Sequence, residues 1–436
     1  MVKDSELSIT AVPDGRSAAI GANSGMDSNV RRVMAGLALG QFGNNGALVS
    51  MVLIGFPITV AELDPDNKAI SLALLMGVHS LIALVAIPFF GALSDRCTSR
   101  LGMRTPFILV GTATEFIAMV GMGLSGSVSM LILFASIHAI GGGVYQGGFS
   151  ALVPDQIGPN YRARAMGLLT MMNAVAGLVA SVFIPAIIGN QLLLFVLPGF
   201  VMLVTTLNAV YVIRDRKLSI SDRPNVSVLR ALLEGYRVNP KRIPDYSWGW
   251  SAKAVFALAS ALLTTYAVYM LTDHLGVTAE DLPALLSIKG VIGLVAAVGG
   301  AWFGTWLSDK LQIRKRLAVY AAVLTFAGAM IIALSPSVPV YLIGLAILGF
   351  GTGAYLPIEG AVVVDVLPGE GKESGKYMSL MAVADRAPRS LGSFFAPALL
   401  AFGALTALGS YPMVYVAGGI LAIIAGLLVR QVKGSV

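Results

Sequence analysis

Hydrophobic positions along the chain fall into long runs that are separated by polar connections. A helix that crosses a bilayer core of about 30 Å needs about 20 apolar residues at a rise of 1.5 Å each. Twelve runs of this length are present in the sequence. They lie at 33–60, 69–93, 105–125, 128–153, 163–188, 192–213, 247–271, 282–307, 316–334, 338–362, 375–402 and 411–429. We therefore predict an all-α membrane protein with twelve transmembrane helices.

The longest polar connection divides the predicted spans into six and six. It covers residues 214–246 and contains a run at 228–236 whose apolar members recur at helical spacing. We interpret this run as an amphipathic helix at the membrane interface; a calmodulin-target segment is the alternative for the same pattern. The predicted units are a tail, a six-helix bundle, a linker, a second six-helix bundle and a tail, at 1–30, 31–213, 214–246, 247–430 and 431–436.

Basic residues mark one side of the predicted membrane. Outside the spans, every Lys and Arg except Lys68 lies in a tail or in alternate connections. Since positively charged connections remain in the cytoplasm, both termini are predicted to be cytoplasmic in the inner (plasma) membrane of a cell.

Composition supports a membrane protein and excludes an ordinary soluble one. Hydrophobic residues make up 56% of the chain and charged residues only 12%, against about 25% in soluble domains. The net charge of +7 would suit a nucleic-acid partner, but the basic residues lie between apolar runs and not on one domain. Cys97 is the one cysteine, and no His, Cys and acid cluster has ligand spacing, so no metal or cofactor is expected.

The two halves share a motif at an offset of 210 residues. The pattern Gly-x-Gly-x-Tyr, followed by Asp ten residues after the Tyr, occurs in both predicted spans 4 and 10. Its members are Gly141, Gly143, Tyr145 and Asp155 in the first copy, and Gly351, Gly353, Tyr355 and Asp365 in the second. This predicts two homologous halves that are related by an axis along the membrane normal.

A second repeat follows predicted spans 2 and 8. Its first copy contains Gly91, Asp95, Arg96, Gly102 and Arg104, and its second contains Asp309 and Lys310, with Thr305 in place of the first Gly. A Gly one turn before Asp allows close helix packing, while the Asp can cap a neighbouring helix and pair with Arg. The motif resembles the loop signature of the major facilitator superfamily. The resemblance implies two bundles that rock about a central cavity, gated by these residues together with Asp155 and Asp365.

The segment 239–253, together with Arg104, Thr105 and Pro106, resembles bacterial members near the glycoside-pentoside-hexuronide and sucrose-proton symporter groups. This resemblance implies a transporter, with a small-molecule solute, a proton and the lipid bilayer as partners. A monomer is expected.

Charged residues inside the predicted spans need a reason, because each costs about 2.5–3.5 kcal/mol on insertion scales. Glu115, Asp385 and Glu359 are therefore candidates for proton coupling. The alternative for Glu115 is a structural ion pair, and the alternatives for Glu359 are a cytoplasmic gate pair and a contact with the solute. Asp385 and Arg389 are spaced for an intrahelical pair, which leaves Arg386 for a carboxylate or an anionic solute. His79 and His138 could relay protons, but a neutral buried role is the default for each.

Neutral polar residues inside the spans suit a cavity for hydroxyl-rich solutes. With Arg386 and Arg389, the candidates for lining it are Gln41, Asn44, Asn45, Tyr145, Gln146, Asn173, Tyr266 and Tyr269. Hydrogen bonding between helices is the alternative for each of them.

The sequence contains neither a phosphate-binding GxxxxGK[ST] loop nor a residue set placed for intramembrane hydrolysis. It therefore predicts a secondary transporter that uses alternating access and is not an enzyme. Proton symport of a sugar or glycoside is the leading hypothesis, and proton-driven export of a small amphipathic or anionic compound is the alternative. A receptor that has lost transport is a third class.

Overall fold

The computed structural model describes residues 28–213, 215–218, 243–366 and 374–434, and these residues form helices and connections without a strand. Most of the predicted tail 1–30 and the predicted amphipathic run 228–236 lie outside the described residues.

Helices of the first half follow the predicted runs within a few residues. They are α1 (Ser28–Ser50), a π-helical turn (Met51–Gly55), α2 (Phe56–Leu63), α3 (Lys68–Ser94), α4 (Thr105–Gly123), α5 (Val128–Phe149), α6 (Leu152–Gln156), α7 (Pro159–Phe183), a 3₁₀ turn (Ile184–Ile187) and α8 (Gln191–Val212).

Helices of the second half also follow the predicted runs. They are α10 (Pro244–Thr265), α11 (Ala267–Tyr269), a π-helical turn (Met270–His274), α12 (Leu282–Leu311), α13 (Arg314–Ala333), α14 (Val338–Asp365), α15 (Ser374–Ala404) and α16 (Ser410–Arg430).

Ten of the described helices are long and apolar enough to cross a membrane, or eleven if the two pieces of 244–274, bent by 43°, form one span. Helix α15 accounts for the difference from the predicted twelve. It carries Lys376, Asp385, Arg386 and Arg389, so only its part Phe394–Ala404 is a shorter apolar helix. The number twelve therefore stays a prediction.

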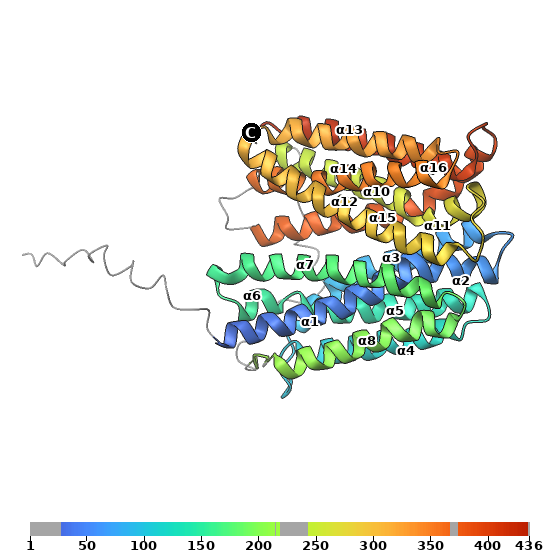
Figure 1. Cartoon of the computed structure of the whole chain (residues 1–436). Helices are drawn as coiled ribbons and strands as arrows, with labels where there is room; N and C mark the ends of the chain where they lie inside the picture. The colour runs from blue at the N-terminus through green and yellow to red at the C-terminus, as the bar shows by residue number, and fades with distance from the viewer. Residues whose placement is uncertain (1–27, 214, 219–242, 367–373, 435–436) are drawn as a thin grey trace, which may run out of the picture.

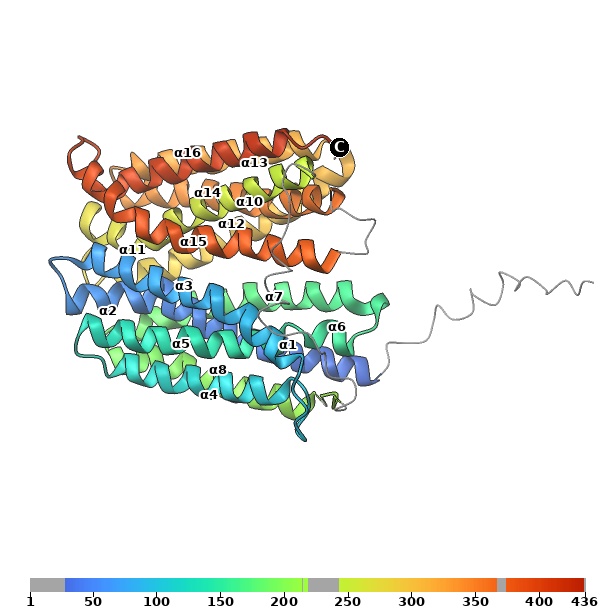
Figure 2. The same cartoon turned by 180° about the vertical axis from the view of Figure 1, so that it is seen from behind.

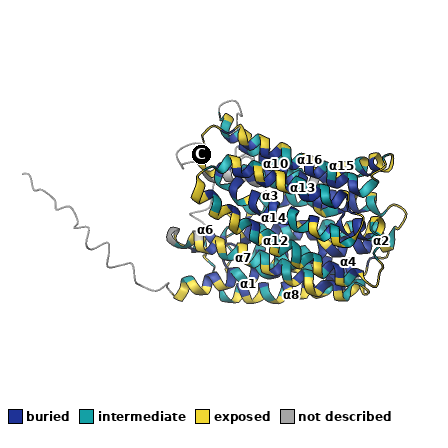
Figure 3. Cartoon of the chain, turned by 45° about the horizontal axis from the view of Figure 1, so that its top comes forward, coloured by how far each residue is buried: buried dark blue, intermediate teal, exposed yellow. Residues whose placement is uncertain are grey.

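Each half packs mainly on itself, and in the same order. In the first half α3 and α4 pack against α5, and α1 packs against α7 and α8. In the second half α12 and α13 pack against α14, and α10 packs against α15 and α16. Figures 1 and 2 show the two groups of helices lying one above the other. Figure 3 shows buried residues between the helices and exposed residues along their outward sides.

Glycines of the repeated motif set how closely the helices approach. A Cβ at Gly143 would collide with Ala86 of α3, and one at Gly353 would collide with the carbonyl group of Ala297 of α12. The two contacts hold equivalent places in the two halves, as expected for a structural repeat.

The halves are joined at one end of the molecule. We call the end with α2 and the turn Met270–His274 the distal end, and the end where α1 begins and α16 finishes the terminal end. At the distal end the Lys68 ammonium lies 2.8 Å from an Asp273 carboxylate oxygen. The hydroxyls of Tyr269 and Tyr266 donate to the carbonyls of Pro57, at 2.9 Å, and of Ala69, at 3.3 Å. Apolar residues of both halves form one buried cluster there.

Candidate functional site

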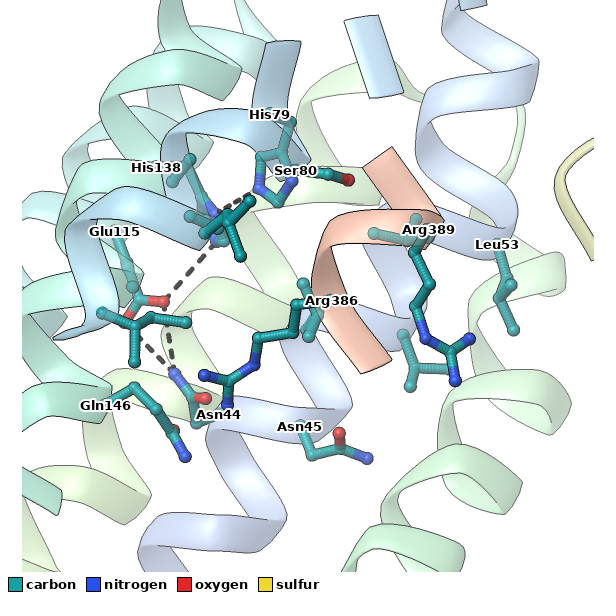
Figure 4. Close-up of a pocket in the computed structure, with 18 of the residues that line it drawn as sticks. Asn44, Asn45, Leu53, His79, Ser80, Glu115, His138, Gln146, Arg386 and Arg389 are labelled. Carbon is teal, nitrogen blue, oxygen red and sulfur yellow. Dashed lines mark hydrogen bonds and ion pairs between the residues drawn. The ribbon is translucent and has the colours of Figure 1, made fainter. Parts of the chain in front are cut away.

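A cavity lies between the first half and α15. Its volume is about 510 Å³, and its wall comes from α1, α3, α4, α5 and α15. Five of the predicted polar residues line it together with both arginines of α15; they are Gln41, Asn44, Asn45, Glu115, Gln146, Arg386 and Arg389 (Figure 4). Its size is typical of a site for a small organic molecule.

Glu115 is the buried acid in the wall of this cavity, with a side chain only 3% exposed. Asn44 donates from Nδ2 to both of its carboxyl oxygens, at 3.2 Å each. A Cβ at Gly142 of α5 would lie 3.1 Å from Oε1, so the glycine allows the carboxyl group to lie against that helix. The position 210 residues later is Thr325, and the acid is therefore not part of the repeat.

Two histidines continue from Glu115 along the same wall. His138 Nε2 lies 3.8 Å from Glu115 Oε1, and His138 Nδ1 lies 3.4 Å from His79 Nε2. Both rings line the cavity, and Figure 4 shows Glu115, His138 and His79 in a row. Sequence reasoning considered both as relays but kept a neutral buried role as the default. Their pairing with Glu115 has no sequence signal, because the three residues lie on different helices.

Amide side chains connect α1 with α7 beside the cavity. Gln41 Nε2 donates to Asn173 Oδ1 at 2.6 Å, and Asn45 Nδ2 donates to the Asn173 carbonyl at 3.2 Å. Asn173 holds these two amides without lining the cavity itself. Gln41 and Asn45 thus line the cavity and also bond to α7, whereas Asn173 only bonds between the helices.

The predicted pair on α15 is confirmed. Arg389 Nη2 lies 3.0 Å from Asp385 Oδ1, with both side chains about 40% exposed. Asp385 is not among the residues that line the cavity. Arg386 extends from α15 toward Asn44 and Gln146 (Figure 4). The second half therefore contributes positive charge to a wall whose other side carries Glu115.

Glu359 lies away from this cavity, in the core of the second half. Its carboxylate is 1% exposed and lies 3.0 Å from the ammonium group of Lys253 on α10. This ion pair lies within one half of the molecule and does not cross between the halves.

The three predicted tyrosines do not line the cavity. Tyr145 is buried, stacks on Phe149 and donates to the Gly40 carbonyl at 3.1 Å. Tyr266 and Tyr269 lie in the distal junction between the halves.

The first loop motif is centred on Arg104, whose side chain is 5% exposed. Its guanidinium group lies 2.6 Å from Asp95 and 2.9 Å from Asp155, and it also donates to Ser94 Oγ at 2.6 Å. Gly91 faces Gly147 of α5, which confirms the expected close approach. Arg96, which follows Asp95 in the same loop, is half-buried.

Gly102 of the same loop has a backbone φ of 118°, a conformation that favours glycine. The predicted cap on the neighbouring helix is supplied by another residue. Asp215 accepts hydrogen bonds from the backbone amides of Arg104, at 2.6 Å, and Thr105, at 2.9 Å, and so caps α4. Sequence reasoning assigned the cap to Asp95 because Asp215 lies far along the chain.

The second loop repeats part of this network. Arg314, which sequence reasoning missed, lies 2.6 Å from Asp365, just as Arg104 pairs with Asp155 210 residues earlier. Gln312 holds the place of Gly102 and has a φ of 52°. The backbone carbonyl of Asp309 accepts a hydrogen bond from the side-chain amide of Gln312 at 2.8 Å. The Lys310 ammonium lies 5.0 Å from the Trp306 ring centre.

Among the described residues, no group of three or more His, Cys, Asp or Glu side chains is arranged to hold a metal ion. The cavity has a largely apolar lining with a group of polar and charged side chains, and it lies between long apolar helices. This arrangement defines a multi-pass membrane protein with a pocket for a small molecule.

Comparisons with known proteins give the family. The model of the Major Facilitator Superfamily matches residues 37–384 and 306–433. The chain belongs to this superfamily. It is a secondary transporter, not an enzyme.

Individual relatives are more distant. The sucrose transport protein SUC3 of Arabidopsis thaliana is 28% identical over 120 residues, which cover 22% of this chain and only 20% of that protein. An inward-facing, unoccupied bacterial homolog of the human lysosomal transporter Spinster has a TM-score of 0.65 at 17% identity, over 94% of this chain and 96% of that one. A peptide transporter POT in complex with sulfate has a TM-score of 0.68 at 14% identity, over 94% and 95%. At such identities the two structures show the fold alone.

Proposed function

We propose that the protein is a proton-coupled symporter of a small hydroxylated solute, with a sugar or glycoside as the substrate class. The arrangement of Glu115 carries this proposal. A carboxyl group inside a membrane protein is stable when it is neutral or paired. Asn44 can hydrogen-bond to its charged form, and His138 lies close enough to exchange a proton with it through a small movement. Glu115 can therefore bind and release a proton beside the solute.

The remaining wall supports the substrate class. Gln41, Asn45 and Gln146 present amide groups, which donate to and accept from hydroxyl groups equally well. The partial similarity to a sucrose transport protein supports the same class.

In this proposal the chain forms twelve membrane spans in two six-helix bundles, 31–213 and 247–430, joined by the linker 214–246. The uneven distribution of Lys and Arg supports cytoplasmic termini, so that the terminal end with its two loop motifs faces the cytoplasm. The distal junction is then the closed outer gate. Alternating access would open this junction and close the cavity at the terminal end.

The decisive experiment measures external pH in a weakly buffered suspension of proteoliposomes. Disaccharides, organic acids and amphipathic compounds are added one at a time. A sugar that enters with a proton makes the medium more alkaline. A response to acids or amphipathic compounds alone would contradict the proposal and favour proton-driven export of such compounds.

Glu115→Gln tests the proton carrier. The amide keeps the size of the side chain but binds no proton, so uptake driven by a pH gradient should fall to the background of empty liposomes. Solute exchange without a gradient should continue, since it needs no proton release. Thr114→Val is the matched control, because Thr114 is the preceding residue of α4, bonds to Val110 of its own helix and does not line the cavity. Acid-driven uptake at the wild-type rate in Glu115→Gln would remove Glu115 from the mechanism.

Arg386→Gln tests whether the cavity recognises negative charge. If Arg386 binds a solute carboxylate, its loss should raise KM about tenfold or more for acidic sugars and leave neutral sugars unchanged, as expected for one charge-assisted hydrogen bond. Transport assays with matched neutral and acidic sugars provide the measurement. An equal loss for both solutes would instead assign Arg386 to the structure of the cavity.

A further inference from the structure

A basic pocket lies at the terminal end, on the outer side of the second half. Helices α13 and α16 form it, and its volume is about 240 Å³. Lys315, Arg316 and Arg430 line it together with Val319 and Tyr320, so its lining carries three positive charges and no acid. The substrate cavity lies elsewhere, against the first half and α15.

Nearby acids do not neutralise these charges. Asp365 is paired with Arg314, which does not line the pocket. The Lys315 ammonium donates one hydrogen bond, to the Val432 carbonyl at 3.2 Å. Within the described ranges, Arg316 and Arg430 form no ion pair. Two guanidinium groups at a membrane surface therefore face the pocket with their donors available.

An apolar surface continues from this pocket toward the middle of the membrane. On α13 it consists of Tyr320 and, one helical turn later, Val323 and Leu324; on α16 it consists of Ile420, Ile424 and Leu427, each about one turn apart. All six side chains are between 37% and 63% exposed. A basic pocket that leads into an apolar surface matches a molecule with an acidic head and a hydrocarbon tail.

The repeat shows that the pocket is an addition to the scaffold. The positions 210 residues before Lys315, Arg316 and Tyr320 are Thr105, Pro106 and Val110, which carry no charge. The ion pair of Arg314 with Asp365 recurs in the first half, but these neighbouring cations do not. Loop geometry common to both halves therefore does not explain them.

We propose that this pocket binds the phosphate group of an anionic phospholipid, whose acyl chains lie along the exposed faces of α13 and α16. Guanidinium groups match phosphate oxygens with paired hydrogen bonds. Basic pockets between membrane helices are suited to acidic lipid headgroups. The site goes beyond the proposed transport function and does not depend on which solute is carried.

The test is native mass spectrometry of the full chain, purified in detergent and titrated with phosphatidylglycerol or with phosphatidylcholine of the same acyl chains. Wild-type protein should retain one phosphatidylglycerol that phosphatidylcholine does not displace. The Lys315→Gln, Arg316→Gln, Arg430→Gln variant should bind that lipid about 100-fold more weakly, at about one kcal/mol for each lost cation. The Arg316→Gln, Arg430→Gln variant keeps the Lys315 contact to Val432 and covers the case in which the triple variant does not fold.

The matched control is Arg31→Gln, Arg32→Gln, Arg164→Gln, which removes the same charge from exposed positions at the same end. It should retain the lipid. Equal loss in the control would mean that net charge alone attracts the lipid, and undiminished binding in the double and triple variants would place the lipid elsewhere; either result overturns the proposal. Soluble glycerol phosphate provides a further arm. If it binds as tightly as phosphatidylglycerol, the pocket is a site for free phosphate esters and the apolar surface has no part in it.

Discussion

At the scale of single residues, Arg104 and Arg314 hold equivalent places but have different surroundings. Arg104 is 5% exposed and contacts two carboxylates, whereas Arg314 is 23% exposed and contacts one. Arg104→Gln leaves Asp155 and Asp95 without their cation, so it should cost about 3 kcal/mol of stability. Arg314→Gln should cost about 1 kcal/mol, as for an exposed pair. Thermal unfolding of both variants in one detergent measures the difference, and equal losses would contradict this account.

The sequence predicted which residues carry chemistry better than it predicted where they point. Glu115 was found because a lone acid in an apolar run needs a reason. The amides of Asn44 and Asn45 were found because they interrupt such a run. Tyr269 was assigned to the cavity but binds Pro57 of the other half, because residues 212 positions apart have no common pattern. Asp215 was missed for the same reason, since its partner Arg104 lies 111 positions away.

At the scale of elements, close helix contacts depend on a few glycines. In α14, a methyl group at Gly353 would overlap the backbone of α12, whereas at Gly360 nothing lies within 4 Å. Gly353→Ala should therefore destabilise the protein by about 1–3 kcal/mol, as overpacking does. Gly360→Ala is the control on the same helix and should be neutral or slightly stabilising, because Ala favours helix by up to about 1 kcal/mol. Thermal unfolding would contradict this if the two variants behaved alike.

Helix positions were the most predictable feature, because each long apolar run has only one way to satisfy its backbone in lipid. The limits of this reasoning lie where an element departs from the simple pattern. Helix α15 combines four charged residues with an apolar end, so hydropathy alone does not mark it as a span. The hydropathy pattern also does not predict the bend of 43° between α10 and the following turns.

At the scale of the whole molecule, the proposed alternating access requires the distal junction to open and close. Lys68 and Asp273 form its ion pair, and Asp273 also accepts from the Tyr411 hydroxyl at 2.7 Å. Since both side chains are about a quarter exposed, the pair contributes about 1 kcal/mol to the closed junction. Lys68→Met should therefore shift the population of the open junction by about fivefold, because 1.4 kcal/mol corresponds to a factor of ten.

Access to the cavity from each side measures that shift. Ser80 lines the cavity, so Ser80→Cys in a Cys97→Ser background supplies a single reporter thiol. With Lys68→Met, a membrane-impermeant thiol reagent should react faster from the distal side and more slowly from the terminal side. Asp273→Asn should act in the same direction, and the double variant should add little to either single change, because both remove one interaction. Additive effects of the two substitutions would show that the residues act separately, and the closed junction would then depend on the tyrosine contacts of Tyr266 and Tyr269 instead.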